Sequence, residues 1–256
     1  MLAASNFEFK NRFWIIGAIF CTAFWSYSID HQNAGVALTE WMARLRGSTA
    51  TNTDYRWTFA IASLFAVLAA AIRTWGTAYL NPEVMIAGRV QTSRLVADGP
   101  YRYVRNPLYF GNILLAIGFG MMASRVGCAI LIVGMLVFVC RLILREEAGL
   151  AASQGDAYRA YCAAVPRLLP TLRPRLPSAR GVPNWTDGFL GEAFMWVMAA
   201  SLVAFAFSLK QEIFFWVLGG SFVVYAICLA IIKLRRKRLD PNLEEKRDES
   251  SAASKL

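Results

Sequence analysis

The sequence predicts an all-α protein, a polytopic membrane helical bundle of about six transmembrane helices with cytosolic segments between them. Hydrophobic residues make up 57% of its 256 residues, and its mean hydropathy is +0.41. These values are typical of membrane proteins rather than of soluble domains. Six apolar runs have roughly the 17 to 25 residues that a helix needs to cross the hydrocarbon core. Lys and Arg residues gather in alternate loops, which the positive-inside rule associates with several membrane crossings.

The apolar runs set the expected helices, which cover residues 13–29, 57–80, 108–124, 126–144, 189–209 and 213–232. The first run follows Lys10 and Arg12, as in a signal peptide. It ends in aromatic and polar residues instead of a cleavage site, so we expect a retained anchor helix. Arg73 interrupts the second run, and its side chain is expected either to reach the inner interface or to face a polar cavity. The third and fourth runs meet at Ser124 and Arg125 and are expected to form a tight hairpin.

The charge distribution predicts the orientation. With both termini in the cytosol, 22 of the 27 Lys and Arg residues lie inside. The five outside are Arg44, Arg46, Arg56, Arg125 and Lys210. This bias, with a basic stretch at 233–238 that anionic head groups attract, explains the net charge of +10 without a nucleic-acid partner. We therefore expect a multi-pass protein of a bacterial inner membrane, with the lipid bilayer as its partner.

Cysteine and histidine usage indicates no metal centre. The five cysteines show no CxxC spacing, and the one histidine, His31, lies in a predicted external loop. This pattern predicts free, packed thiols and neither a metal site nor a haem ligand.

Four parts are expected along the chain. Residues 1–80 hold the first two transmembrane helices and an external loop with one short helix, and residues 81–176 hold a central core of cytosolic loop, helical hairpin and amphipathic helix. Residues 177–239 hold a linker and a C-terminal hairpin, helices 5 and 6, expected to serve packing or homo-oligomerisation. The charged, Ser/Ala-rich tail at 240–256 is expected to be disordered.

Polar residues gather first at 93–112, at the predicted cytosolic membrane face. Pro107 favours the first position of a helix and Asn106 its cap, which leaves the amides of Leu108, Tyr109 and Phe110 without intrahelical acceptors. Such a helix end attracts an anion, and Arg105 adds positive charge. The alternative is a simple helix start with interfacial Arg and Tyr residues.

A second polar group begins with Arg145, Glu146 and Glu147 at the end of the fourth run. Adjacent residues on a helix point about 100° apart, so the two carboxylates are expected to have different partners. One can pair with Arg145 or a neighbouring arginine, and the other can face a cavity and hold an ammonium group. Tyr158 and Tyr161 lie three apart on a short helix expected after Gly155. The alternative is an interfacial amphipathic helix.

In order along the chain, the motifs GPYRYVRNPLYFGN, REEAGL and QGDAYRAYCAAVPRLLP resemble the isoprenylcysteine carboxyl methyltransferase family and the related phospholipid N-methyltransferases. The resemblance covers residues 80–170. It implies a membrane helical bundle whose cytosolic segments enclose S-adenosyl-L-methionine, with a lipophilic substrate entering from the bilayer. It also implies methyltransferase activity. Methyl transfer is an in-line displacement, so positioning and desolvation matter more than a strong base.

The resemblance implies a set of cofactor contacts: Ser93, Arg94, Leu95, Val96, Tyr101, Asn106, Pro107, Leu108, Tyr109 and Glu146. The helix end at Asn106 suits the methionine carboxylate, Glu146 suits the ammonium, and tyrosines can cover the adenine and the sulfonium. Few catalytic side chains are expected. The candidates for positioning the substrate are Arg105, Asn106 and Arg145, and those for contacting the methyl acceptor are Arg141, Arg145 and Glu147.

Two positions depart from the family pattern. Asn106 stands where the family has a histidine, and Leu142 stands where the family has an arginine that contacts the acceptor carboxylate, although Arg141 and Arg145 flank it. The acceptor is therefore expected to be a lipophilic or small carboxylate, amine or thiol. Two other classes stay open: an NADPH-dependent reductase of the sterol type, which has related architecture, and a non-catalytic membrane scaffold or transporter.

Overall fold

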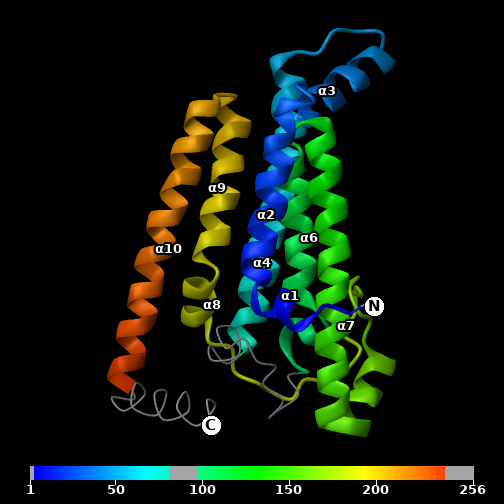
Figure 1. The fold of residues 1–256 in the computed structure, drawn as a ribbon, viewed down its shortest axis with the longest axis vertical. Coiled ribbons are helices and arrows are strands. Elements are labelled where there is room, and N and C mark those ends of the chain that lie inside the picture. The colour runs from blue at the N-terminus through cyan, green and yellow to red at the C-terminus, as the bar shows by residue number, and fades with distance from the viewer. Residues whose placement is uncertain (1–2, 81–96, 240–256) are drawn as a thin grey trace.

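The computed structural model describes residues 3–80 and 97–239, and within these ranges the chain is helical and has no strand (Figure 1). The expected disordered tail at 240–256 lies outside the described residues. The elements are α1 (Asn6–Lys10), α2 (Arg12–Trp25), η1 (Ser26–Ser28), α3 (Ala34–Leu45), α4 (Asn52–Tyr79), η2 (Gly99–Arg102), α6 (Pro107–Gly120), α7 (Arg125–Ala164), α8 (Trp185–Gly191), α9 (Ala193–Ser208) and α10 (Gln211–Leu239).

The all-α class is confirmed, and each of the six apolar runs contains a helix. Among the described residues, three helices are long and apolar enough to cross a membrane: α4, α7 and the Gln211–Cys228 part of α10. A fourth span arises if α8 and α9, which meet at 61°, count as one. The α2 and α6 helices have 14 residues each, short of a full crossing. Six crossings and the orientation stay predictions.

The long helices run side by side with α4 among them (Figure 1). The α4 helix packs against α6 on one side and α9 on another, while α7 packs against α6 and α2. Small residues allow these close approaches, as is common between membrane helices. A Cβ atom at Gly118 would lie 2.7 Å from the Ala62 carbonyl oxygen of α4, and one at Gly127 would lie 2.1 Å from the Ala23 carbonyl oxygen of α2.

The expected hairpin between the third and fourth runs is present. The α6 helix ends at Gly120 and α7 begins at Arg125, where the Ser124 hydroxyl accepts a 3.0 Å hydrogen bond from the Gly127 amide. Ser124 and Ser26 also share a 2.6 Å hydrogen bond, and Arg125 pairs with Asp30 at 2.8 Å. The hairpin brings the start of α6 and the later part of α7 together at the opposite end of the bundle.

The α7 segment is broken at Gly155, whose φ of 57° and ψ of −127° are not helical. Glycine takes this left-handed backbone without steric cost, so the chain can turn there. The short helix expected after Gly155 is therefore confirmed, and it buries Tyr158 and Tyr161 in a small cluster with Val165.

Candidate functional site

The start of α6 has the expected boundary but a different side-chain arrangement. Asn106 holds the N-cap position and Pro107 the first helical one, yet the Asn106 side chain makes no capping hydrogen bond. Its Nδ2 donates instead to the Arg167 carbonyl oxygen at 2.9 Å and to Glu147 Oε1 at 3.3 Å. The amides of Leu108 and Tyr109 are thus left uncapped by this side chain. The expectation for Phe110 was wrong, because its amide donates to the Asn106 carbonyl oxygen at 3.0 Å and so begins the hydrogen-bond pattern of the helix.

Glu146 and Tyr109 face each other across α7 and α6. The Tyr109 hydroxyl donates a 2.7 Å hydrogen bond to Glu146 Oε1, and both side chains are half-buried. Tyr109 stands in the first turn of α6, next to the uncapped amides. The structure therefore brings together a carboxylate, a phenol and the positive end of a helix, three groups expected from the sequence to contact the cofactor.

Glu147 points to other partners, as expected for two adjacent carboxylates. It is buried and pairs with Arg167 at 2.9 Å and with Arg105 at 3.4 Å. The arginine expected as an alternative partner, Arg145, lies elsewhere. Glu147 thereby ties α7 to the segment before α6 and to the linker after α7.

Arg141 and Arg145 both contact the N-terminal segment, at residues 4–8. Arg141 pairs with Glu8 at 2.8 Å, and Arg145 donates to the Ala4 carbonyl oxygen at 3.0 Å and to the Asn6 side chain. Between them Leu142 is fully buried in a cluster with Ala4 and Phe9. The two candidate acceptor arginines thus lie under α1. Their role toward a substrate stays a prediction.

Tyr101 lies in η2, in a short turn held by Asp98. The Asp98 carboxylate accepts hydrogen bonds from the amides of Gly181 at 2.7 Å and Gly99 at 2.9 Å, and from the Ser178 hydroxyl at 3.1 Å. Tyr101 is buried, and its carbonyl oxygen accepts a 2.8 Å hydrogen bond from the Tyr161 hydroxyl. The predicted contacts Ser93, Arg94, Leu95 and Val96 lie outside the described residues.

We expect Asp98→Asn to loosen this turn. The Gly181 amide, with the other donors, holds the pKa of Asp98 below its ordinary value. Its stabilising effect is therefore present above the ordinary Asp pKa and is lost as the pH falls through the lowered one. Loss of charged hydrogen bonds, worth about 1.5 kcal/mol, should speed amide exchange of the Gly181 peptide about tenfold.

Hydrogen exchange read by mass spectrometry checks this, with Asp156→Asn as a control because Asp156 lies exposed on α7. Unchanged exchange at Gly181 in the Asp98 variant would contradict the expected role.

The sequence did not reveal a buried polar cluster around Arg73. Arg73 Nε lies 2.7 Å from Glu192 Oε2, and its Nη1 donates to Asn112 Oδ1 at 2.8 Å and to the Leu108 carbonyl oxygen at 3.2 Å. The Thr77 hydroxyl also donates to Glu192, whose exposure is only 1%. Arg73 thus faces a polar site, the second of the two expected alternatives. The missed signal is the one acidic residue in the apolar run 189–209.

The cluster joins the C-terminal hairpin to the candidate site. Glu192 stands at the bend between α8 and α9, while Leu108 lies in the first turn of α6, beside Tyr109. The hairpin, expected to serve packing or oligomerisation, packs on α4. It also supports the helix that carries the candidate cofactor contacts.

Comparison with known proteins gives one family match. Residues 57–152 match the isoprenylcysteine carboxyl methyltransferase (ICMT) family. This range covers most of α4, all of α6 and α7 as far as Ala152, so it includes Tyr109, Glu146 and Arg73 but not Glu192 or α1. The resemblance of the motifs to this family is thereby confirmed, and the third motif, at 154–170, lies beyond the matched range.

Two curated relatives are similar to parts of the chain. The cobalt-zinc-cadmium resistance protein CzcN of Cupriavidus metallidurans is 27% identical over 133 residues, 52% of this chain and 58% of that protein. The protein-S-isoprenylcysteine O-methyltransferase of Schizosaccharomyces pombe is 33% identical over 91 residues, 35% of this chain and 39% of that protein. The chain thus spans less than two thirds of either relative. No solved structure matches it significantly.

Proposed function

We propose, from the assignment of residues 57–152 to the ICMT family, that the chain is an integral membrane methyltransferase that uses S-adenosyl-L-methionine. The single observation that supports it best is the Tyr109 to Glu146 contact beside the uncapped start of α6. The amino-acid part of this cofactor carries a carboxylate and an ammonium group. A helix N-terminus favours the first and a carboxylate the second.

The groups in place fit the chemistry that the cofactor supplies, a methyl group on a positive sulfur. Glu146 would hold the ammonium, and the amides of Leu108 and Tyr109 would hold the carboxylate. Tyr109 and the buried Tyr101 supply aromatic rings, whose faces attract cations. Positioning and exclusion of water are the contributions that an in-line displacement needs from these residues.

The acceptor in this proposal is a lipophilic or small carboxylate, amine or thiol at the cytosolic membrane face. The yeast relative is named for methylating protein-S-isoprenylcysteine. In this chain the position of the family's acceptor-binding arginine is Leu142, fully buried in a cluster with Ala4 and Phe9. This favours an acceptor other than an isoprenylcysteine carboxylate.

The proposal includes the orientation, with both termini in the cytosol of a bacterial cell and the catalytic core in residues 81–176. The distribution of Lys and Arg supports it. Reporter fusions after Arg46 and after Arg175 test it, since only the first should report an external location.

Calorimetric titration with S-adenosylhomocysteine tests the function. Binding of one molecule per chain is expected, and a folded protein that binds none would refute the proposal. Incubation of the protein with a native lipid extract and methyl-labelled cofactor, followed by mass spectrometry, would then identify the acceptor.

A further inference from the structure

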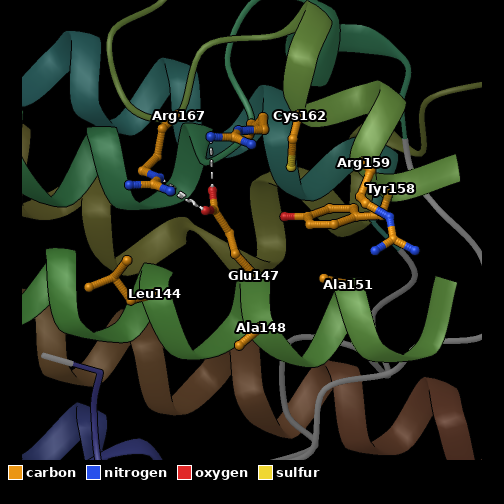
Figure 2. Close-up of a pocket in the computed structure, with 9 residues that line it drawn as sticks. Leu144, Glu147, Ala148, Ala151, Tyr158, Arg159, Cys162 and Arg167 are labelled. Atoms are coloured by element: carbon orange, nitrogen blue, oxygen red, sulfur yellow. Dashed lines mark hydrogen bonds and ion pairs between the residues drawn. The ribbon is translucent and has the colours of Figure 1, made fainter. Parts of the chain in front are cut away.

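A basic pocket lies on the Glu147 side of α7, about 380 Å³ in volume (Figure 2). Its lining residues are Arg105, Leu144, Glu147, Ala148, Ala151, Tyr158, Arg159, Cys162 and Arg167. Figure 2 shows Glu147 rising from α7 toward Arg167, with the Tyr158 hydroxyl pointing toward the same carboxylate. The volume falls in the range of small-molecule sites, about 300 to 1,000 Å³.

The charges in the basic pocket do not balance. Glu147 forms ion pairs with two guanidinium groups. Its Oε2 lies 2.9 Å from Arg167, and its Oε1 lies 3.4 Å from Arg105. The Asn106 amide takes a further contact with Oε1. Two cations therefore share one anion, and the cluster keeps one positive charge.

Arg105 has a hydrogen-bond donor without an acceptor. Its side chain is 9% exposed, and its Nε is buried without a hydrogen-bond partner among the described residues. A buried donor left unpaired costs free energy unless a ligand or water accepts its hydrogen bond. Since this side chain lines the basic pocket, an oxyanion bound there would supply the missing negative charge, and a rotation of the guanidinium group would present the unpaired donor to it.

The rest of the lining suits an amphiphile. Leu144, Ala148 and Ala151 form an apolar floor along α7, while Arg159 on the short helix after Gly155 is exposed at the rim. The floor continues the apolar helix toward the bilayer, at the end of the bundle predicted to face the cytosol. Basic pockets at this membrane face are typical binding sites for anionic lipid head groups.

We propose that the basic pocket binds a phosphate group, carried by an anionic membrane lipid. Arg105, Arg159 and Arg167 would donate to the phosphate oxygens, and the lipid chains would leave along the apolar floor. Glu147 points about 100° away from Glu146 on α7, so the basic pocket opens on another face of this helix than the proposed ammonium contact and adjoins the predicted cofactor contacts only at Asn106. The proposal does not depend on methyl transfer.

Native mass spectrometry of the full chain in detergent tests the proposal with phosphatidylglycerol and phosphatidylcholine as probes. Tighter binding of phosphatidylglycerol is expected. Arg167→Gln and Arg159→Gln should each weaken that preference about fivefold, the effect of one basic residue near an anionic lipid. Both side chains are at least half exposed, and thermal unfolding of each variant checks that the fold survives, above all where Arg167→Gln removes the 2.9 Å partner of Glu147.

Arg173→Gln is the matched control, because Arg173 is exposed on the linker outside the basic pocket. An equal loss in this variant, or no lipid preference in the unmodified chain, would overturn the proposal. Displacement of the lipid by inorganic phosphate would keep the phosphate chemistry and overturn the lipid source. Displacement by S-adenosylhomocysteine would overturn the separate site and assign the pocket to the methyl donor.

Discussion

Replacing Glu146 with alanine is expected to weaken S-adenosylhomocysteine binding about 100-fold. The carboxylate is the proposed partner of the ligand's ammonium group, and a charged hydrogen bond of this kind contributes up to about 3 kcal/mol. Tyr109→Phe should cost less, about fivefold, because it removes only the hydroxyl that orients Glu146 by a 2.7 Å hydrogen bond. Calorimetric titration of each variant measures these changes.

Two controls make the Glu146 result interpretable. Glu40→Ala removes a carboxylate from α3 at the far end of the bundle and should leave binding unchanged (Figure 1). Thermal unfolding of each variant shows whether the fold survives. A folded Glu146→Ala protein with unmodified affinity would remove the main support for the cofactor site.

Glu192→Ala is expected to lower the free energy of unfolding by about 3 kcal/mol, because it leaves the partly buried Arg73 guanidinium without its anion. Replacing both residues with leucine should cost less than the two single changes together, since no buried charge then stays unpaired. Denaturant unfolding in micelles measures both. Glu212→Ala, at the exposed start of α10, is the control.

A loss below about 1 kcal/mol in Glu192→Ala would show that the ion pair does not stabilise the bundle. If the variant unfolds as expected, its S-adenosylhomocysteine affinity at low temperature tests the link to the site. A loss of affinity in folded Glu192→Ala protein would show that Arg73 helps to position the first turn of α6.

Local sequence patterns were sufficient to predict the helices and part of the candidate cofactor site. Apolar runs located the helices, Pro107 fixed the start of α6, and the angle between adjacent residues separated the roles of Glu146 and Glu147. Each of these inferences depends on residues that are close in sequence.

The features that the sequence did not reveal depend on distant partners. The Asn106 side chain was expected to cap α6. It donates its hydrogen bonds instead to Glu147 and to the Arg167 carbonyl oxygen, which are 41 and 61 residues away in sequence. Glu8 pairs with Arg141, which is 133 residues away in sequence. No local periodicity encodes such pairings. The 61° bend near Glu192 was missed because hydropathy averages over a run and does not detect a break within it.

The separation of Arg73 and Glu192 also sets an order of events during synthesis. The two residues are 119 positions apart in sequence. At a translation rate of about 5 to 20 residues per second, Glu192 is therefore synthesised roughly 6 to 24 s after Arg73. During that interval the Arg73 cation of the candidate span α4 has no anion, a state that costs up to about 3 kcal/mol at a helix centre and less near a helix end, where Arg73 lies. Release of a chain that ends before residue 192 would leave α4 in this state, exposed to membrane quality control.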